Sequence, residues 1–321
     1  MSSDRRTHRF AAIVPVGRTA IDLCRGVAVI ESLCRWEPAT LTWCVIVDDA
    51  PGERGIAVLA NVPATCQTVT LLNPRRGSGG DWRGAVTAGL LAAFSWIDAN
   101  TDADFALKID TDALAIAPFA DAIAAFLADS PGAGIIGALG VSCNPVYRAK
   151  QNLKREPDTL RARRLWPSAS SVDTDYAQEF EDFGVVTRDH LLAFDRIRPI
   201  VDAAVAHGYA TSEYCQGGAV AFSRTFIGRM SAAGYLSDPK PWIRLPFWGD
   251  LNIAMFVRAV DLHVEDCSQP GQPFGIQYLG LPYPPEELVA RGYSLIHSVK
   301  NDRRFSETAI RHFFTQRAQM R

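Results

Sequence analysis

An excess of charge of one sign is missing from this 321-residue chain, in which 33 lysines and arginines face 35 acidic residues and the formal net charge is −2. A balance this close to neutral gives no general attraction to polyanions, and nucleic acid is not expected as a partner. Closely spaced cysteines are missing too: the seven cysteines are odd in number, and no two are closer than ten residues in the sequence. Their spacing excludes zinc ribbons and thioredoxin-like motifs and favours a reducing compartment.

Long apolar runs are also absent. The run Phe10–Val16 meets Gly17-Arg18 too soon for a secretory signal and is typical of a strand. The longest uncharged stretches, 55–74 and 130–147, contain prolines, glycines and polar residues, unlike an apolar membrane span of ~20 residues. We therefore expect no membrane span and a cytoplasmic location.

Apolar residues make up 48% of the chain and charged residues 21%, enough for a large core without disulfides or structural metals. No linker-like break divides the sequence, so we expect one domain over residues 1–321. Between Asn144 and Gly184 a basic stretch is followed by serines and then by acidic residues. This change predicts a surface insertion at 144–184, either a lid or an acceptor loop, although such a charge run is also typical of a solvated helix face.

Strand and helix patterns alternate along the first half of the chain. Thr19 with Asp22 three residues later predicts a capped helix start. The alternation predicts an α/β fold with a mainly parallel central sheet flanked by helices, whose ligands bind beyond the carboxyl ends of the strands. The predicted strands are 10–16, 41–47, 68–72, 104–109 and 134–140, and the predicted helices are 19–34, 84–97 and 120–128.

Asp110 and Asp112 follow the fourth predicted strand. Carboxylates at i and i+2 of an extended segment point the same way, so the pair is suited to binding one hard cation. An Asp-x-Asp triplet alone is weak evidence for a metal site, because aspartate is also a common turn former. Its place after a buried strand, behind Lys108, favours the metal site.

Three later segments carry further candidates. Gly217 and Gly218 would let the backbone approach a sugar or diphosphate closely, or would form a turn or bulge before a core strand. Asp250 opens an apolar helix, where an acid is also favoured simply as a cap. His297 would complete a metal shell, with Lys300 offsetting phosphate charge, although a lone histidine is usually structural or solvated.

In this order, the segments resemble the beta-1,3-glycosyltransferases of the fringe and core-1 galactosyltransferase type. The resemblance spans roughly residues 104 to 300 and rests on the ordered set of motifs. It implies a GT-A (Rossmann-like) fold, a UDP-sugar donor, Mn²⁺ or Mg²⁺, and inversion at the anomeric carbon. The matching segments are Phe105-Ala-Leu-Lys-Ile-Asp-Thr-Asp112, Tyr214–Arg224, Asp250–Val257 and His297.

The resemblance also implies roles for single residues. Asp112 would be the direct metal ligand and His297 the second protein ligand. Asp110 would contact the ribose or reach the metal through water, and Asp250 would be the general base. Apart from the resemblance, Glu213 is the alternative base if Asp250 is not the base. This chain departs from the family at two positions, with Thr111 where an acid is frequent and Gly249 where glutamate usually precedes the base. The membrane anchor of the family's eukaryotic members is not found, which moves the expected acceptor to the cytoplasm.

The donor site is expected to include residues from the first half of the chain. Asp48, at the end of the second predicted strand, is placed to bind the uracil or ribose. Trp82 suits either a sugar face or a core position, and the aromatic residues Trp242, Phe247 and Trp248 suit either an acceptor platform or the core. Surface arginines are mostly solvated, yet three near the glycine-rich loop are candidates for the diphosphate or sugar: Arg75, Arg76 and Arg83.

Two other functions are compatible with these motifs. A nucleotidyltransferase that forms a sugar nucleotide also combines strand-end carboxylates with a metal, but its glycine-rich signature normally follows the first strand, whereas here the glycines occur at 77–80. A non-catalytic protein that binds a sugar nucleotide or glycan is the other alternative. The acceptor itself, whether glycan, natural product or peptide, is left open.

Overall fold

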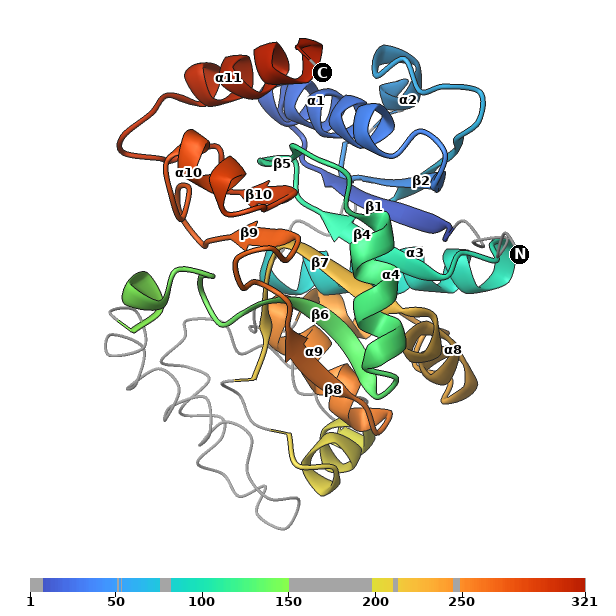
Figure 1. Cartoon of the computed structure of the whole chain (residues 1–321). Helices are drawn as coiled ribbons and strands as arrows, with labels where there is room; N and C mark the ends of the chain where they lie inside the picture. The colour runs from blue at the N-terminus through green and yellow to red at the C-terminus, as the bar shows by residue number, and fades with distance from the viewer. Residues whose placement is uncertain are drawn as a thin grey trace, which may run out of the picture.

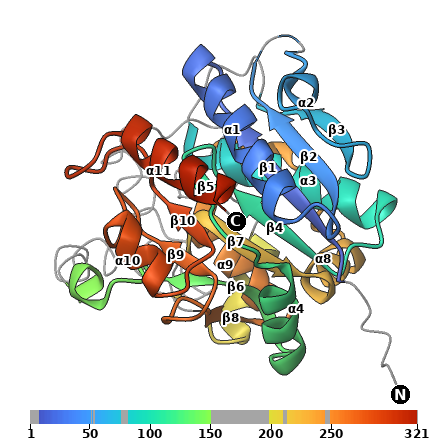
Figure 2. The same ribbon diagram turned by 45° about the horizontal axis from the view of Figure 1, so that its top comes forward.

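The computed structural model of the protein describes residues 8–50, 52, 54–75, 82–149, 198–209, 213–244 and 249–320, with the side chains of 82–85 and 244 left out. Its centre is a seven-stranded sheet in the order β3-β2-β1-β4-β7-β6-β8 (Figures 1 and 2). All neighbouring strands run parallel except β7, which is antiparallel to both β4 and β6. The predicted α/β fold with a mainly parallel sheet is therefore confirmed. The strands are β1 Phe10–Val16, β2 Leu41–Asp48, β3 Gln67–Leu72, β4 Phe105–Ile109, β6 Ala133–Leu139, β7 Cys215–Ser223 and β8 His263–Asp266.

Helices cover both faces of this sheet, and the alternation of strand side chains divides the core in two. Phe10, Ala12 and Val14 of β1 belong to the core beneath α1, whereas Ala11 and Ile13 belong to the core beneath α3. The helices are α1 Ala20–Trp36, α2 Ile56–Leu59, α3 Trp82–Asn100, α4 Ala120–Asp129, α8 Arg224–Ala232, α9 Gly249–Ala259, α10 Pro285–Ala290 and α11 Glu307–Gln319, with a 3₁₀ helix at Lys240–Arg244 and helical residues at 145–149 and 198–206.

A second, three-stranded sheet was not predicted. It consists of β5 Ala113–Ala115, β10 Leu295–His297 and β9 Phe274–Ile276, in the order β5-β10-β9. Strands of three residues are too short to show a sequence period. Because β5 follows β4 closely, the chain passes from the large sheet into the small one at the Asp110–Asp112 triplet (Figure 1).

The start of α1 agrees with its prediction. The Thr19 hydroxyl accepts a hydrogen bond from the Asp22 amide at 3.1 Å, and the Asp22 carboxylate accepts one from the Thr19 amide at 3.0 Å. Across the described part of the chain, every helix is too short or too polar to cross a membrane. Most of the insertion predicted at 144–184 lies outside the described residues, as does its role as a lid or acceptor loop.

Candidate metal and donor site

The Asp110–Asp112 triplet is a turn and not the extended segment predicted from the sequence. The Ala113 amide donates to the Asp110 carbonyl at 3.0 Å, because the chain must turn between the two sheets. The Asp110 amide donates to the Gly218 carbonyl at 2.9 Å, and the Val299 amide donates to the Asp112 carbonyl at 2.8 Å. Bonds to β7 of the large sheet and to the segment that follows β10 thus fix the backbone that carries the two carboxylates.

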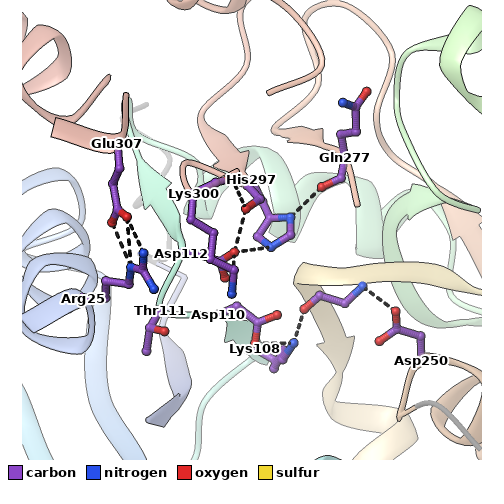
Figure 3. A network of polar contacts seen from close by, with 12 residues as sticks. Arg25, Lys108, Asp110, Thr111, Asp112, Asp250, Gln277, His297, Lys300 and Glu307 are labelled. Atoms are coloured by element: carbon purple, nitrogen blue, oxygen red, sulfur yellow. Dashed lines mark hydrogen bonds and ion pairs between the residues drawn. The ribbon is translucent and has the colours of Figure 1, made fainter. Parts of the chain in front are cut away.

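His297 reaches the triplet through β10, which pairs with β5. Its Nε2 lies 3.3 Å from Asp112 Oδ2, and its Nδ1 lies 2.7 Å from the Gln277 carbonyl oxygen (Figure 3). With Nδ1 donating to that carbonyl, Nε2 is the nitrogen left to bind a metal, the arrangement typical of metal-ligating histidines. Ligand atoms of Asp110, Asp112 and His297 all lie within 4.8 Å of one another, so the structure brings the three predicted metal residues together.

The chemistry of this trio fits Mn²⁺ or Mg²⁺, because carboxylate oxygens with one imidazole suit such cations. Positive and donor groups already surround Asp112 Oδ2, with Ser298 Oγ donating at 2.7 Å and Lys300 Nζ at 3.1 Å. Burial by itself raises the pKa of Asp112, but His297, Lys300 and Ser298 outweigh it and hold that pKa well below the usual range. Asp112 is therefore ionised, as a metal ligand must be.

Gly217 and Gly218 lie within β7, neither in a turn nor in a loop. A Cβ on Gly217 would come closer than 3.0 Å to the Asp250 carboxylate, and a Cβ on Gly218 closer than 3.0 Å to the His297 ring. The glycines were predicted either to admit a sugar or diphosphate to the backbone or to form a turn or bulge before a core strand, and the register of β7 against β6 does shift between the pairs Gly137–Val220 and Leu139–Cys215. In this structure they make room for the side chains of Asp250 and His297.

Asp250 is the second residue of α9 and is half-buried. The Gly217 amide donates to its Oδ2 at 3.1 Å, so the carboxylate is tied to β7 (Figure 3). On the other side of that glycine, Lys108 Nζ donates to the Gly217 carbonyl and lies 2.8 Å from Asp110 Oδ1. Burial raises the pKa of Asp250, while Lys108 and the Gly217 amide act against the rise.

A cavity of about 170 Å³ opens at the carboxyl ends of β1 and β2. Asp48 does not line it: this side chain is fully buried, and its carboxylate accepts from Arg54 and from the Ala50 amide at 3.0 Å. The acid in the lining is Asp49, held by Arg18 Nε at 3.0 Å and by Arg75 Nε at 2.8 Å. Position 49 therefore replaces position 48 as the acid that faces this space, and Arg75 lines the cavity as well.

Other candidates have separate outcomes. Trp242 is 2% exposed and packs on Phe256 at 4.4 Å between ring centroids, so it is a core residue. The Glu213 carboxylate accepts from Arg258 at 2.7 to 3.0 Å. Predictions for five residues fall outside what the structure describes, either for the whole residue or for its side chain: Arg76, Trp82, Arg83, Phe247 and Trp248.

Ser298 and Gln277 were missed by sequence reasoning. Ser298 directly follows His297, yet a serine in a loop carries no signal of its own. Gln277 acts through its main-chain carbonyl, which any residue possesses. The only available signal was the position of Ser298 between two predicted site residues, His297 and Lys300.

No family model matches the sequence, and no curated protein matches it. Among solved structures, the chain is similar to core-mannan synthase A from Aspergillus fumigatus in its Mn/GDP form, with 11% identity, a TM-score of 0.40 and coverage of 83% of this chain and 74% of that one. It is also similar to the mannosyltransferase PcManGT from Pyrobaculum calidifontis in complex with GDP-Man and Mn²⁺, with 15% identity, a TM-score of 0.39 and coverage of 80% and 54%. A third similar structure is S. aureus TarS 1–349 in complex with UDP, with 17% identity, a TM-score of 0.31 and coverage of 41% of this chain and 35% of that one. The matches thus span about half of PcManGT and about a third of TarS 1–349. Because these TM-scores are low, the function has to be argued from the residues of the site.

Proposed function

We propose that the protein is a metal-dependent glycosyltransferase of the GT-A type, which moves a sugar from a nucleoside diphosphate sugar to an acceptor hydroxyl. One observation carries the proposal: ligand atoms of Asp110, Asp112 and His297 lie within 4.8 Å of one another. The carboxylate of Asp250 contacts Gly217, and the next residue of β7, Gly218, faces the His297 ring. A metal-dependent inverting sugar transfer uses both kinds of group, a cation for the leaving diphosphate and a base for the incoming hydroxyl.

The donor nucleoside is proposed to occupy the cavity beside Asp49. β1, whose end borders the cavity, is the neighbour of β4, which leads into the triplet, so both features share one edge of the sheet. UDP is the proposed nucleotide, from the resemblance to the fringe and core-1 type. Mn²⁺ or Mg²⁺ bound by Asp110, Asp112 and His297 would offset negative charge on the diphosphate, which is worth several kcal/mol in the transition state. Lys300, beside Asp112, adds positive charge at the same place.

In the proposed inverting transfer, Asp250 takes the proton of the acceptor hydroxyl as that oxygen attacks the anomeric carbon. The hydrogen bond from the Gly217 amide fixes the direction of the carboxylate. A raised pKa makes Asp250 a stronger base than an exposed aspartate, which suits proton transfer near neutral pH. Lys108 holds both Asp110 and the Gly217 carbonyl, so one buried cation ties the metal half of the site to the base half.

Release of nucleoside diphosphate tests the proposal. The full chain is incubated with a panel of UDP- and GDP-sugars and Mn²⁺, with and without EDTA, and the products are identified. Metal-dependent release of a nucleoside diphosphate is expected. A parallel incubation with a sugar phosphate and a nucleoside triphosphate tests the alternative, since release of pyrophosphate there would indicate a nucleotidyltransferase. Binding of a sugar nucleotide with no product at all would indicate a non-catalytic protein.

Replacing Asp112 with asparagine is expected to weaken Mn²⁺ binding by at least about 100-fold, because the change removes the ionised oxygen that His297, Ser298 and Lys300 surround. Free Mn²⁺ can be followed by electron paramagnetic resonance during titration of the protein. Asp121→Asn, an exposed position on α4, is the control and should bind Mn²⁺ as the wild type does. Unchanged affinity in Asp112→Asn would place the cation elsewhere.

A further inference from the structure

An ion-pair network lies behind the metal triplet. Glu307 opens α11 and accepts from Arg25 of α1, with Nε at 3.0 and 3.1 Å from its two carboxylate oxygens and Nη2 at 2.5 Å from Oε2. Arg311, one turn further along α11, donates from Nε to Glu307 Oε1 at 2.9 Å. The three side chains are only 20 to 24% exposed, and α11 lies beside α1 in both views (Figures 1 and 2).

The network reaches the triplet at its middle residue. Arg311 Nη2 donates to the Thr111 carbonyl at 3.3 Å. The Thr111 side chain lies against α1, where a Cβ on Gly26 would be 3.7 Å from its methyl carbon. Thr111 stands where the resembling family often has a third acid, and here its side chain lies against α1 while its carbonyl accepts from Arg311 of α11. Figure 3 shows Thr111 near Arg25 and the Asp112 side chain.

This contact bears on the direction of the Asp112 side chain. The Thr111 carbonyl belongs to the peptide unit that joins Thr111 to Asp112, so its orientation sets the position of the Asp112 Cα. Gly218 and Val299 hold the backbone on either side of that unit, and Arg311 holds the unit itself. A shift of this peptide would change the spacing of the two carboxylates, on which cation affinity depends.

The network also balances charge near the cation site. Arg25 lies close enough to Asp112 for that carboxylate to contribute to its raised pKa, although the hydrogen bond with Glu307 is the larger cause. Burial raises the pKa of Glu307, but Arg25 and Arg311 outweigh it and hold that pKa below the ordinary value. Glu307 is therefore ionised and neutralises one of the two guanidinium charges. Without it, two uncompensated cations would lie close behind the metal residues.

We propose that Glu307 is a positioning residue for the metal site. By holding Arg311 on the Thr111 carbonyl, and by balancing the charge of Arg25 and Arg311, Glu307 sets the affinity of the triplet for its cation. The inference rests on the proposed function, because it concerns the Mn²⁺ or Mg²⁺ that Asp110, Asp112 and His297 are proposed to bind.

The test is the Mn²⁺ affinity of the full-length Glu307→Gln variant, measured on free Mn²⁺ by electron paramagnetic resonance without any substrate. An affinity about 10-fold weaker than that of the wild type is expected, as for other residues that support metal ligands from behind. Glu287→Gln is the matched control: it also breaks a Glu–Arg pair at i and i+4, with Arg291 on the neighbouring helix α10. That pair packs on Tyr283, and the control should keep the affinity of the wild type.

Arg311→Met supplies a second route, since it leaves the Arg25–Glu307 pair in place and keeps the test open if Glu307→Gln does not fold. It removes the hold on the Thr111 carbonyl but leaves Arg25 balanced by Glu307, so it should weaken Mn²⁺ binding by less than Glu307→Gln does. The double variant should bind Mn²⁺ no more weakly than Glu307→Gln, because the two changes act on the same connection to Thr111. If Glu307→Gln and Arg311→Met both bind Mn²⁺ as tightly as the wild type, Glu307 does not position the metal site. The same conclusion follows if the control Glu287→Gln loses as much Mn²⁺ affinity as Glu307→Gln. A wild type that binds no Mn²⁺ overturns the metal site itself, and this role with it.

Discussion

Replacing Asp250 with asparagine is expected to lower kcat for sugar transfer by about 10²- to 10⁴-fold, the usual contribution of a positioned general base. Asparagine has nearly the same shape and can still accept the hydrogen bond of the Gly217 amide through its oxygen. It cannot take up the proton of the acceptor hydroxyl. Donor and Mn²⁺ binding should therefore stay close to wild-type values, since Asp250 belongs neither to the lining of the cavity beside Asp49 nor to the group of three metal residues.

Glu213→Gln is the comparison for this variant. Glu213 was the alternative base, but Arg258 occupies both of its carboxylate oxygens. Its replacement should leave kcat within a few-fold of the wild type. Near-full activity in Asp250→Asn would show that the base is elsewhere or that the transfer retains the anomeric configuration. The configuration of the product, read by nuclear magnetic resonance, separates these two outcomes.

The pH profile provides an independent measure of the same residue. Burial raises the pKa of Asp250 above its ordinary value, which for aspartate is about 3.9. Only the ionised carboxylate accepts a proton, so kcat/KM should fall as the pH drops through this raised pKa. The acid limb is thus expected at a higher pH than an exposed aspartate would give. Asp250→Asn should remove this limb from its residual activity.

The centre of the large sheet was predictable because strands such as β1, β4 and β7 are buried on both faces, whereas the edge strand β8 was not predicted. A continuous apolar run such as Phe10–Val16 identifies a strand of this kind, and the acids that follow Leu41–Asp48 and Phe105–Ile109 mark the strand ends. The convergence of Asp110 and Asp112 was predicted for the wrong reason. A turn, and not strand alternation, directs the two carboxylates, because the chain leaves one sheet for another at that point.

Contacts between residues far apart in sequence set the limit of prediction. Arg25 and Glu307 are separated by 282 positions, and neither carries a local motif that indicates the other. Asp48 and Asp49 show a second limit. Both acids come at the end of an apolar run in the sequence. Arg54, which lies beyond the turn, donates a hydrogen bond to the Asp48 carboxylate, and Asp49 is the acid that faces the cavity. His297 was predicted as a metal ligand from its place after a predicted strand and from the order of motifs, but the pairing of β10 with β5 that brings it to the triplet has no sequence signal.

Gly218→Ala is expected to abolish high-affinity Mn²⁺ binding, by about 100-fold or more, and sugar transfer with it. The added methyl would come within 3.0 Å of ring atoms of His297, a side chain buried on all sides and bonded to the Gln277 carbonyl. The ring must move, which displaces Nε2 from Asp112. Such overpacking typically costs about 1 to 3 kcal/mol of stability, so the variant should still fold.

The neighbouring Gly217→Ala variant separates the two halves of the site. Its methyl would meet the Asp250 carboxylate and not the histidine, so kcat should fall while Mn²⁺ affinity is retained. Gly228→Ala on α8 is the control, since a Cβ there has no atom within 4 Å and alanine favours a helix by about 0.5 to 1 kcal/mol. It should be fully active and slightly more stable. If Gly218→Ala kept its Mn²⁺ affinity, His297 would not be a metal ligand. The separate roles of the two glycines, Gly218 for the metal site and Gly217 for the base, would then be wrong.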